Sequence, residues 1–375
     1  MTVGPIERIS HGEFLWVVMV SMVAGGIYVW PQVALSGGGA DWEWAAVAAF
    51  LLSALSSRAQ LAWARRAAGA TYFDRLHAVW GALAWPWYTV DTAASLVLDA
   101  MLLALYAQML ETFFYPSLSA LPFRLLVGCL AGWFAAQSLP TLARNAQFWM
   151  PVVLASFLVL TAVTATQIHF PSALLPPWPP APAAVAAGTG QIWFLWSEGE
   201  VSATLAPWVR GATWRSTARW ALAAHLAQAS VLAVAAFLVV ATLGPWAARV
   251  LEWPMIYEFE GLGPTSLSLV RPNMLVIPFW TTAFVLYLAV RLFHRSLDIQ
   301  SALRLAPAGR IAPVCAFTLA IVGATFALPD SSTLLTLLTR DLSPFLLAWS
   351  IVRTGATWGL AAVRRGAPTP VTPRP

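Results

Sequence analysis

Long apolar segments joined by short connections constrain this chain more than any other feature. Of its 375 residues, 59% are hydrophobic and only 10% are charged. Soluble domains carry about 25% charged residues, so the composition excludes a soluble globular fold, and it excludes intrinsic disorder as well. Because a membrane-spanning helix needs about 20 mainly apolar residues, the sequence predicts an all-α integral membrane protein.

Ten segments are predicted as transmembrane helices, and the last has the weakest boundaries because charged residues interrupt it. No separate soluble domain fits between them, so residues 1–363 are expected to form a single membrane domain. Residues 364–375 are expected to form a disordered cytoplasmic tail, and the proline-rich connection 171–182 an extended outer loop. The ten segments cover residues 14–35, 41–56, 86–111, 123–139, 148–168, 188–208, 217–243, 273–293, 311–328 and 334–360.

The basic residues are 21 arginines without a single lysine, and this segmentation places them mostly on one side of the membrane. One side consists of the N-terminus, the connections between segments 2 and 3, 4 and 5, 6 and 7, and 8 and 9, and the C-terminal segment. This side holds 17 arginines, whereas the other side holds 4. Cytoplasmic loops carry such an excess, so both termini are expected to be cytoplasmic. The arginines are interpreted as topology signals in short loops, and a nucleic-acid partner is not expected.

Two of the predicted helices are interrupted at corresponding places. The first contains Gly25 and Gly26 followed by Pro31, and the sixth contains Ser197-Glu198-Gly199-Glu200 followed by Pro207. Breaks at matching positions of two halves predict a 5+5 inverted repeat with a binding site near the bilayer midplane, where freed backbone groups can bind a small ion or zwitterion. The alternative is that the glycines only allow close helix packing.

Carboxylates inside apolar segments are the second signal. Asp91 and Asp99 lie in the third segment, eight residues apart, so both can face the bundle interior. A charge at the bilayer centre costs at least about 2.5 kcal/mol, so such residues usually pair, become protonated or bind something. A structural role is favoured for Asp91, either as a pair with an arginine or as a neutral, hydrogen-bonded acid. For Asp99 and Glu200 a structural and a functional role are equally open. The predicted ligand-binding residues are Gly25, Gly26, Asp99, Ser197, Glu198, Gly199 and Glu200.

Signatures of catalysis and of cofactors are missing from the sequence. It contains no phosphate-binding loop, nucleophile elbow or metal-ligand spacing, so neither an enzyme, a metal site nor a cofactor is expected. His225 lies within the seventh segment and is interpreted as a packed core histidine rather than a proton relay.

Four short patterns in series resemble one known family. The first is Ile9-Ser10 with Phe14, Gly25 and Pro31, and the second is Ala143-Arg144 with Pro151. The others are Glu200 with Pro207, and Arg271 with Trp280. Over residues 9–355 the chain resembles the B subunits of spore germinant receptors, the spore germination permease family of the amino acid–polyamine–organocation superfamily.

This resemblance implies a ten-helix inverted-repeat bundle in the plasma membrane of a bacterium, specifically the inner membrane of a spore. Such a subunit binds a germinant, typically an amino acid, between helices 1, 3, 6 and 8. Its partners are a larger membrane-anchored A-type subunit and a C-type lipoprotein subunit.

Three functions are compatible with these patterns. The first is a germinant receptor subunit that binds a small molecule and signals by a conformational change. The second is a proton-coupled amino acid transporter, in which protonation of Glu200 or Asp99 drives uptake. The third is a structural membrane subunit with a vestigial site. All three use the same bundle, so the fold does not separate them.

Overall fold

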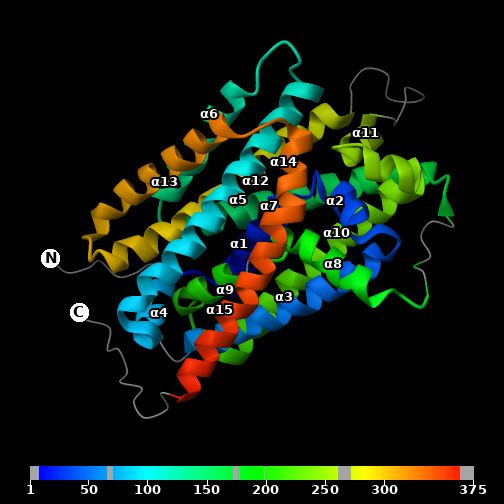
Figure 1. Ribbon diagram of the computed structural model, residues 1–375. Coiled ribbons are helices and arrows are strands. Elements are labelled where there is room, and N and C mark those ends of the chain that lie inside the picture. Colours follow the sequence, from blue (N-terminus) through cyan, green and yellow to red (C-terminus); the bar gives the residue numbers. More distant parts are fainter. Residues whose placement is uncertain are drawn as a thin grey trace.

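The computed structural model describes residues 8–65, 71–171, 176, 178–197, 199–260 and 272–363. Within these ranges the chain is almost entirely helical and contains no β-strand, only one isolated β-bridge. The helices pack side by side as an elongated bundle (Figure 1). The expected tail, the centre of the predicted outer loop and Glu198 lie outside the described residues.

Each of the ten predicted segments corresponds to helix in the structure. Seven are single helices: α3 (Trp42–Ala64), α5 (Ala84–Phe113), α6 (Leu121–Ala136), α7 (Leu139–Thr164), α10 (Trp214–Val250), α12 (Pro272–Ala302) and α13 (Ile311–Ala324). Three are divided: α1 (His11–Val23) with α2 (Trp30–Gly38), α8 (Pro182–Ile192) with α9 (Gly199–Leu205), and α14 (Ser331–Leu337) with α15 (Ser343–Val363).

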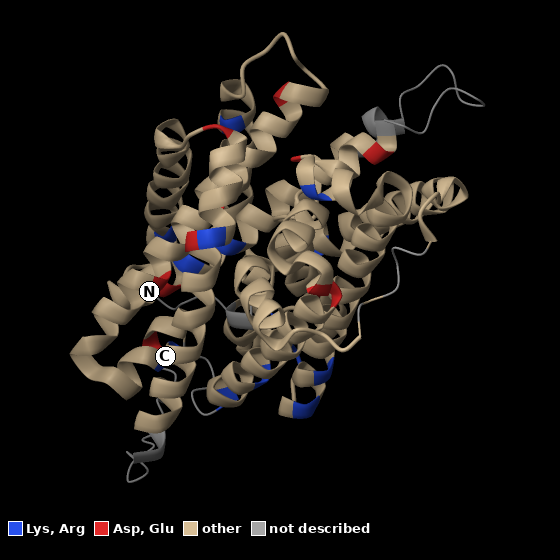
Figure 2. Cartoon of the chain, turned by 45° about the vertical axis from the view of Figure 1, so that its right-hand side comes forward, with Lys and Arg blue, Asp and Glu red and all other residues tan. Residues whose placement is uncertain are grey.

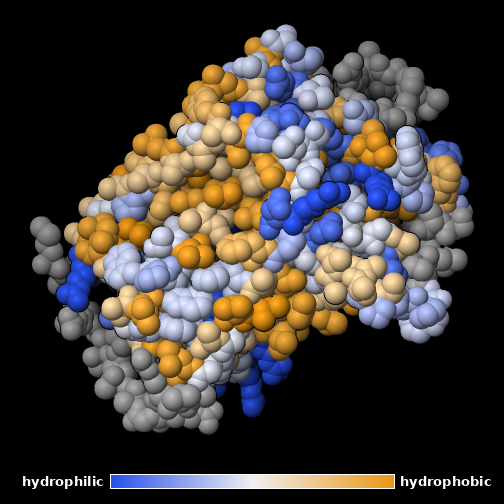
Figure 3. Space-filling view, in the orientation of Figure 1, coloured by the Kyte–Doolittle hydropathy of each residue, from blue (hydrophilic) through white to orange (hydrophobic). Residues whose placement is uncertain are grey.

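The exposed surface matches a membrane environment. Seven helical stretches of the described chain are long and apolar enough to cross a bilayer, and α1 and α6 are shorter apolar helices. Figure 3 shows hydrophobic residues spread over the side of the bundle formed by α6 and α13. Large side chains such as Leu319 and Trp133 are 73% and 59% exposed there. The chain is therefore a multi-pass membrane protein.

Several predicted boundaries were wrong. The fifth helix begins at Leu139 rather than at residue 148, because Leu142, Ala143 and Ala146 of its first turns are buried in the protein. The eighth helix continues to Ala302 rather than ending at Phe293. Two short helices in the connections, α4 (Tyr72–Trp80) and α11 (Pro254–Glu260), were not predicted. Two of the charges in the tenth segment, Arg340 and Asp341, lie in a π-helical turn, Leu338–Leu342, that joins α14 to α15.

Helix α10 contains a local break near its end. Gly244 has a φ of +81°, a conformation that residues with a Cβ rarely adopt, and Pro245 follows it. The predicted end of the seventh segment at residue 243 therefore coincides with a real change of backbone direction.

The divided first and sixth segments lie together at the centre of the bundle. Helix α1 packs against α7, α10 and α12, whereas α2 packs against α8 and α10, and α3 packs against both α8 and α9. The N–H of Ile9, just before α1, donates to the carbonyl of Trp208 at 3.0 Å, and the N–H of Arg210 donates back to the carbonyl of Ile9 at 2.8 Å. This pairing joins the start of the first segment to the end of the sixth.

Candidate functional site

The break of the first segment is a turn of six residues, 24–29, between α1 and α2. The N–H groups of Val29 and Trp30 donate to the carbonyls of Gly26 and Ile27 at 3.2 and 3.3 Å, three residues back rather than four. Pro31 occupies the first turn of α2, where its missing N–H costs nothing. The two glycines and the proline thus end one helix and start another, as the sequence predicted.

The break of the sixth segment begins with a 3-10 turn, Trp193–Leu195, and α9 starts again at Gly199. Side chains of neighbouring helices bind the carbonyls that this break releases. Ser53 of α3 donates to the carbonyl of Trp196 at 2.6 Å, and Gln228 of α10 donates to the carbonyl of Leu195 at 2.7 Å. Backbone groups without water must be paired inside the protein, so these two side chains stabilise the interrupted helix.

The two breaks contact each other and α12. A Cβ placed on Gly26 would lie 2.5 Å from Cδ2 of Leu195, and a Cβ on Gly25 would lie 2.6 Å from ring carbons of Tyr287. No side chain fits at such distances without moving its neighbours. We call this set, Gly25, Gly26, Phe194, Leu195 and Tyr287, the break contact. The glycines therefore allow close packing in addition to interrupting the helix.

Asp99 of α5 is completely buried beneath the break contact. Three residues one turn apart on α12 bind it: Tyr287 donates its hydroxyl at 3.2 Å, Arg291 Nε lies at 2.5 Å and Arg295 Nη1 at 2.7 Å. Such pairing is what makes a buried carboxylate tolerable. Asp99 therefore links α5 to α12 directly below the two helix breaks.

Asp91 is also buried, but it binds different helices. Its carboxylate accepts hydrogen bonds from Nη1 of Arg353 in α15, at 2.8 Å to each oxygen. The hydroxyl of Tyr72 in α4 and the indole N–H of Trp349 in α15 also donate to it. Of the two structural roles expected for Asp91, the structure shows the pair with an arginine, Arg353.

A small polar cavity of about 30 Å³ lies between these groups. Ser197 lines it from the sixth-segment break, together with Asp91 and the partners of Asp99, Arg291 and Arg295. The hydroxyl of Ser197 donates to the carbonyl of Phe194 at 3.1 Å. We call Asp91, Asp99, Arg291, Arg295 and Arg353 the charged cluster. Figure 2, with basic residues blue and acidic residues red, shows how few charged residues the helices carry.

A second cavity, also about 30 Å³, is apolar and lies beside the turn between α1 and α2. Tyr28 and Tyr106 line it together with Trp280 of α12. The Tyr28 hydroxyl donates to the carbonyl of Leu102 at 2.9 Å, and the Tyr106 ring stacks on Phe284 with 4.3 Å between centroids. The first break thus adjoins an apolar cavity and the sixth a polar one.

The predicted site residues are only partly brought together. Gly25 and Gly26 meet the sixth-segment break, Asp99 lies below it, and Ser197 lines the polar cavity. Gly199 is the first residue of α9, whereas the side chain of Glu200 and the whole of Glu198 lie outside what the structure describes. In the described chain no group of side chains is suited to hold a metal ion.

Four of the arginines that the sequence assigns to topology signals are buried inside the protein. Arg75, Arg291, Arg295 and Arg353 are each at most 6% exposed and lie inside the bundle, not in loops. Without them the count is 13 arginines against 4, so the asymmetry remains. The signal that could have identified two of them is the four-residue spacing Tyr287, Arg291, Arg295 on a continuing helix.

A further buried network was not predicted. The carboxylate of Asp298 accepts the N–H groups of Tyr72 and Phe73 at 2.9 and 3.3 Å, at the start of α4. Nε2 of His294 lies 3.5 Å from Asp298 and 2.9 Å from the hydroxyl of Thr204 in α9. This chain of polar groups connects α4 and α12 to the second half of the broken sixth segment. By contrast, His225 is a packed histidine, as expected, with Nδ1 bonded to the carbonyl of Ala221 at 2.8 Å.

The bundle was compared with the structures of known proteins. The structure is similar to the crystal structure of an Eremococcus coleocola manganese transporter in complex with an aromatic bis-isothiourea substituted compound. The TM-score is 0.56 at 13% sequence identity, and the match covers 94% of this chain and 83% of that chain. The likeness concerns the fold, a helical bundle of the amino acid permease type, and confirms the predicted fold class.

A search of curated proteins found no match to the sequence. The family model described as spore germination protein, the spore permease family, matches residues 77–332, more than half of the chain. This match agrees with the patterns that the sequence shares with spore germination permeases. The chain therefore belongs to the spore germination protein family of membrane permeases.

Proposed function

We propose that this protein is the membrane subunit of a spore germinant receptor and binds a small zwitterion, an amino acid, at the break contact. The observation that carries the proposal is that the breaks of the first and sixth segments meet directly above Asp99 and its arginines. Backbone groups at helix breaks bind charged ligand groups. The arginines of α12 suit a ligand carboxylate, and Asp99 and Glu200 suit its ammonium group.

Binding requires the bundle to open. Each cavity beside the break contact measures about 30 Å³, which is room for one or two water molecules and not for an amino acid. A ligand that enters must separate Tyr287 from Gly25 or Leu195 from Gly26. Because a ligand shifts a conformational equilibrium by its difference in affinity for the two states, amino acid binding would favour an open bundle.

The proposed output is conformational and is read by partner subunits. The A-type membrane subunit and the C-type lipoprotein are expected to contact this subunit in the inner membrane of the spore. The arginine asymmetry supports cytoplasmic termini. The chain from Thr204 through His294 to Asp298 would carry movement of α9 to α4 and α12.

The decisive experiment uses purified protein in proteoliposomes with a panel of labelled amino acids, with and without a pH gradient. Saturable binding of one amino acid without accumulation supports the receptor. Glu200→Gln should abolish that binding while the protein stays folded and inserted, whereas Glu111→Gln, a change at the end of α5, should leave it intact. Normal binding by Glu200→Gln would remove Glu200 from the site, and no binding by any panel member, with or without partner subunits, would contradict the proposal.

A proton-coupled amino acid transporter is the second candidate. The buried contact between His294 and Asp298 favours it, since ionisable groups inside a membrane commonly form proton relays. Accumulation driven by the pH gradient in the same proteoliposomes, and lost in Asp298→Asn, would establish the transporter instead of the receptor.

A further inference from the structure

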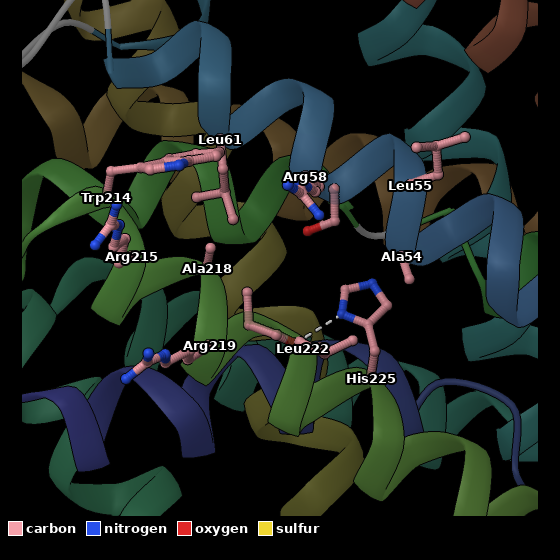
Figure 4. Close-up of a pocket in the computed structure, with 12 residues that line it drawn as sticks. Ala54, Leu55, Arg58, Leu61, Trp214, Arg215, Ala218, Arg219, Leu222 and His225 are labelled. Carbon is pink, nitrogen blue, oxygen red and sulfur yellow. Dashed lines mark hydrogen bonds between the residues drawn. The ribbon is translucent and has the colours of Figure 1, made fainter.

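A groove separate from the break contact runs between α3 and α10. Its volume is about 440 Å³, and its walls are mainly apolar, with Leu55 and Leu61 on α3 facing Ala218 and Leu222 on α10. Figure 4 shows the residues of the two helices facing each other across this hollow. His225, whose Nδ1 donates to Ala221, closes the inner end (Figure 4).

Three arginines line the same groove. Arg215 and Arg219 lie one turn apart at the start of α10, about 6 Å along its axis, and Arg58 faces them from the last part of α3. All three are exposed, and within the described chain none has an ion pair or hydrogen bond. Positive charge therefore accumulates at the groove with no acidic residue in its lining.

The surface beyond the groove is suited to a hydrocarbon chain. Leu55 and Leu51 on α3 are 65% and 58% exposed, and Leu222 and Leu226 on α10 are 47% and 50% exposed. These pairs continue away from the arginines along both helices. An apolar path that starts at several arginines is complementary to a molecule with an anionic head and a long apolar tail. Basic pockets between transmembrane helices bind anionic lipid head groups in this way.

We propose that the groove between α3 and α10 is a binding site for an anionic phospholipid of the surrounding membrane. The phosphate lies among Arg58, Arg215 and Arg219, and one acyl chain follows the groove toward His225. Ser57, which lines the groove, also bonds the hydroxyl of Ser202 in α9 at 2.9 Å. The bound lipid is thereby in contact with residues that support the second half of the sixth segment.

The test is native mass spectrometry of the purified protein titrated with phosphatidylglycerol or with phosphatidylcholine of the same acyl chains. The native protein should retain phosphatidylglycerol preferentially. Replacing Arg58, Arg215 and Arg219 one by one with Gln should weaken that binding about fivefold for each arginine removed, with little effect on phosphatidylcholine. Arg144→Gln, which removes an exposed arginine outside the groove, is the matched control. Equal retention of the two lipids, or an equal loss in Arg144→Gln, would overturn the proposal.

Two further arms separate a lipid from a free anion. Ala218→Phe fills the groove and leaves the arginines in place, so it should weaken binding of both lipids; unchanged binding would show that no acyl chain lies there. Soluble glycerol phosphate should displace phosphatidylglycerol only at far higher concentration, and displacement at equal concentration would make the site one for free phosphate esters. Each variant is first compared with the native protein by size exclusion and thermal unfolding, so that a folding defect is recognised.

Discussion

The break contact and the charged cluster lie next to each other but are stabilised in opposite ways. At the break contact, glycines meet the ring of Tyr287 and the side chain of Leu195, and shape complementarity excludes any larger residue. In the charged cluster, Asp99 and Asp91 are each bound by arginine, and this electrostatic pairing stabilises the cluster. Both regions are closed in this structure, so the proposed ligand would have to displace rings in the first and compete with ion pairs in the second.

Removing the charge of Asp99 is expected to have the largest effect. Asp99→Asn leaves Arg291 and Arg295 buried without that carboxylate, and the loss of one partner of a buried pair costs about 3–5 kcal/mol. We expect a much lower folded yield and a lower thermal unfolding midpoint in detergent, measured without ligand. Asp341→Asn, at an exposed position in the π-helical turn, is the control and should behave as the native protein. A fully stable Asp99→Asn would mean that the cluster does not depend on this charge.

At the break contact the corresponding change is Gly25→Ala. Its Cβ would lie 2.6 Å from the ring of Tyr287, and overpacking of this kind costs about 1–3 kcal/mol. Gly355→Ala, in α15, has no atom within 4 Å of the added Cβ and should be neutral or stabilising. Thermal unfolding compares the two. A larger change, Gly25→Leu, should also block the proposed amino acid binding, and binding by a folded Gly25→Leu protein would mean that the turn is only a packing contact.

Asp91 should respond less than Asp99, although both are buried carboxylates. In Asp91→Asn the amide oxygen can still accept from Trp349, and the amide N–H can donate to the hydroxyl of Tyr72. Only Arg353 loses its charged partner. We expect a loss of about 2 kcal/mol in unfolding free energy with amino acid binding unchanged. Abolished binding in a well-folded Asp91→Asn protein would extend the ligand site into the polar cavity.

Glu258 of α11 provides a pH test at a distance from both regions. Burial raises the pKa of this carboxyl to about 7, although the Thr242 hydroxyl donates to it at 2.8 Å and lowers the pKa slightly. The folded protein therefore binds a proton that the unfolded chain has released, and stability should fall as pH rises from about 4.5 to 7, by on the order of 2 kcal/mol. Glu258→Gln should flatten this part of the profile of unfolding midpoint against pH, and an unchanged slope would assign it to other groups.

The sequence predicts the presence of each helix better than it predicts where the helix ends. Ten apolar segments and two breaks can be read from the sequence because hydrophobic runs and Gly–Pro punctuation are local signals. The eighth helix continues beyond its predicted end at residue 293 because Arg295, in the next turn, pairs with Asp99 inside the bundle. A hydropathy window does not detect pairing between residues that are distant in the sequence. The same reason explains why Arg353 and Arg75 were counted as loop residues.

The sequence by itself determined the membrane-spanning all-α fold and the positions of the interruptions at Gly25 and Ser197. Only the tertiary structure decided that Asp91 pairs with Arg353, and that Asp99 binds two arginines nearly 200 positions away. It also decided that Gly26 packs against Leu195 and that three arginines line one groove. The physical reason is that burial and backbone freedom depend on local composition, whereas charge pairing and close packing depend on which helices become neighbours.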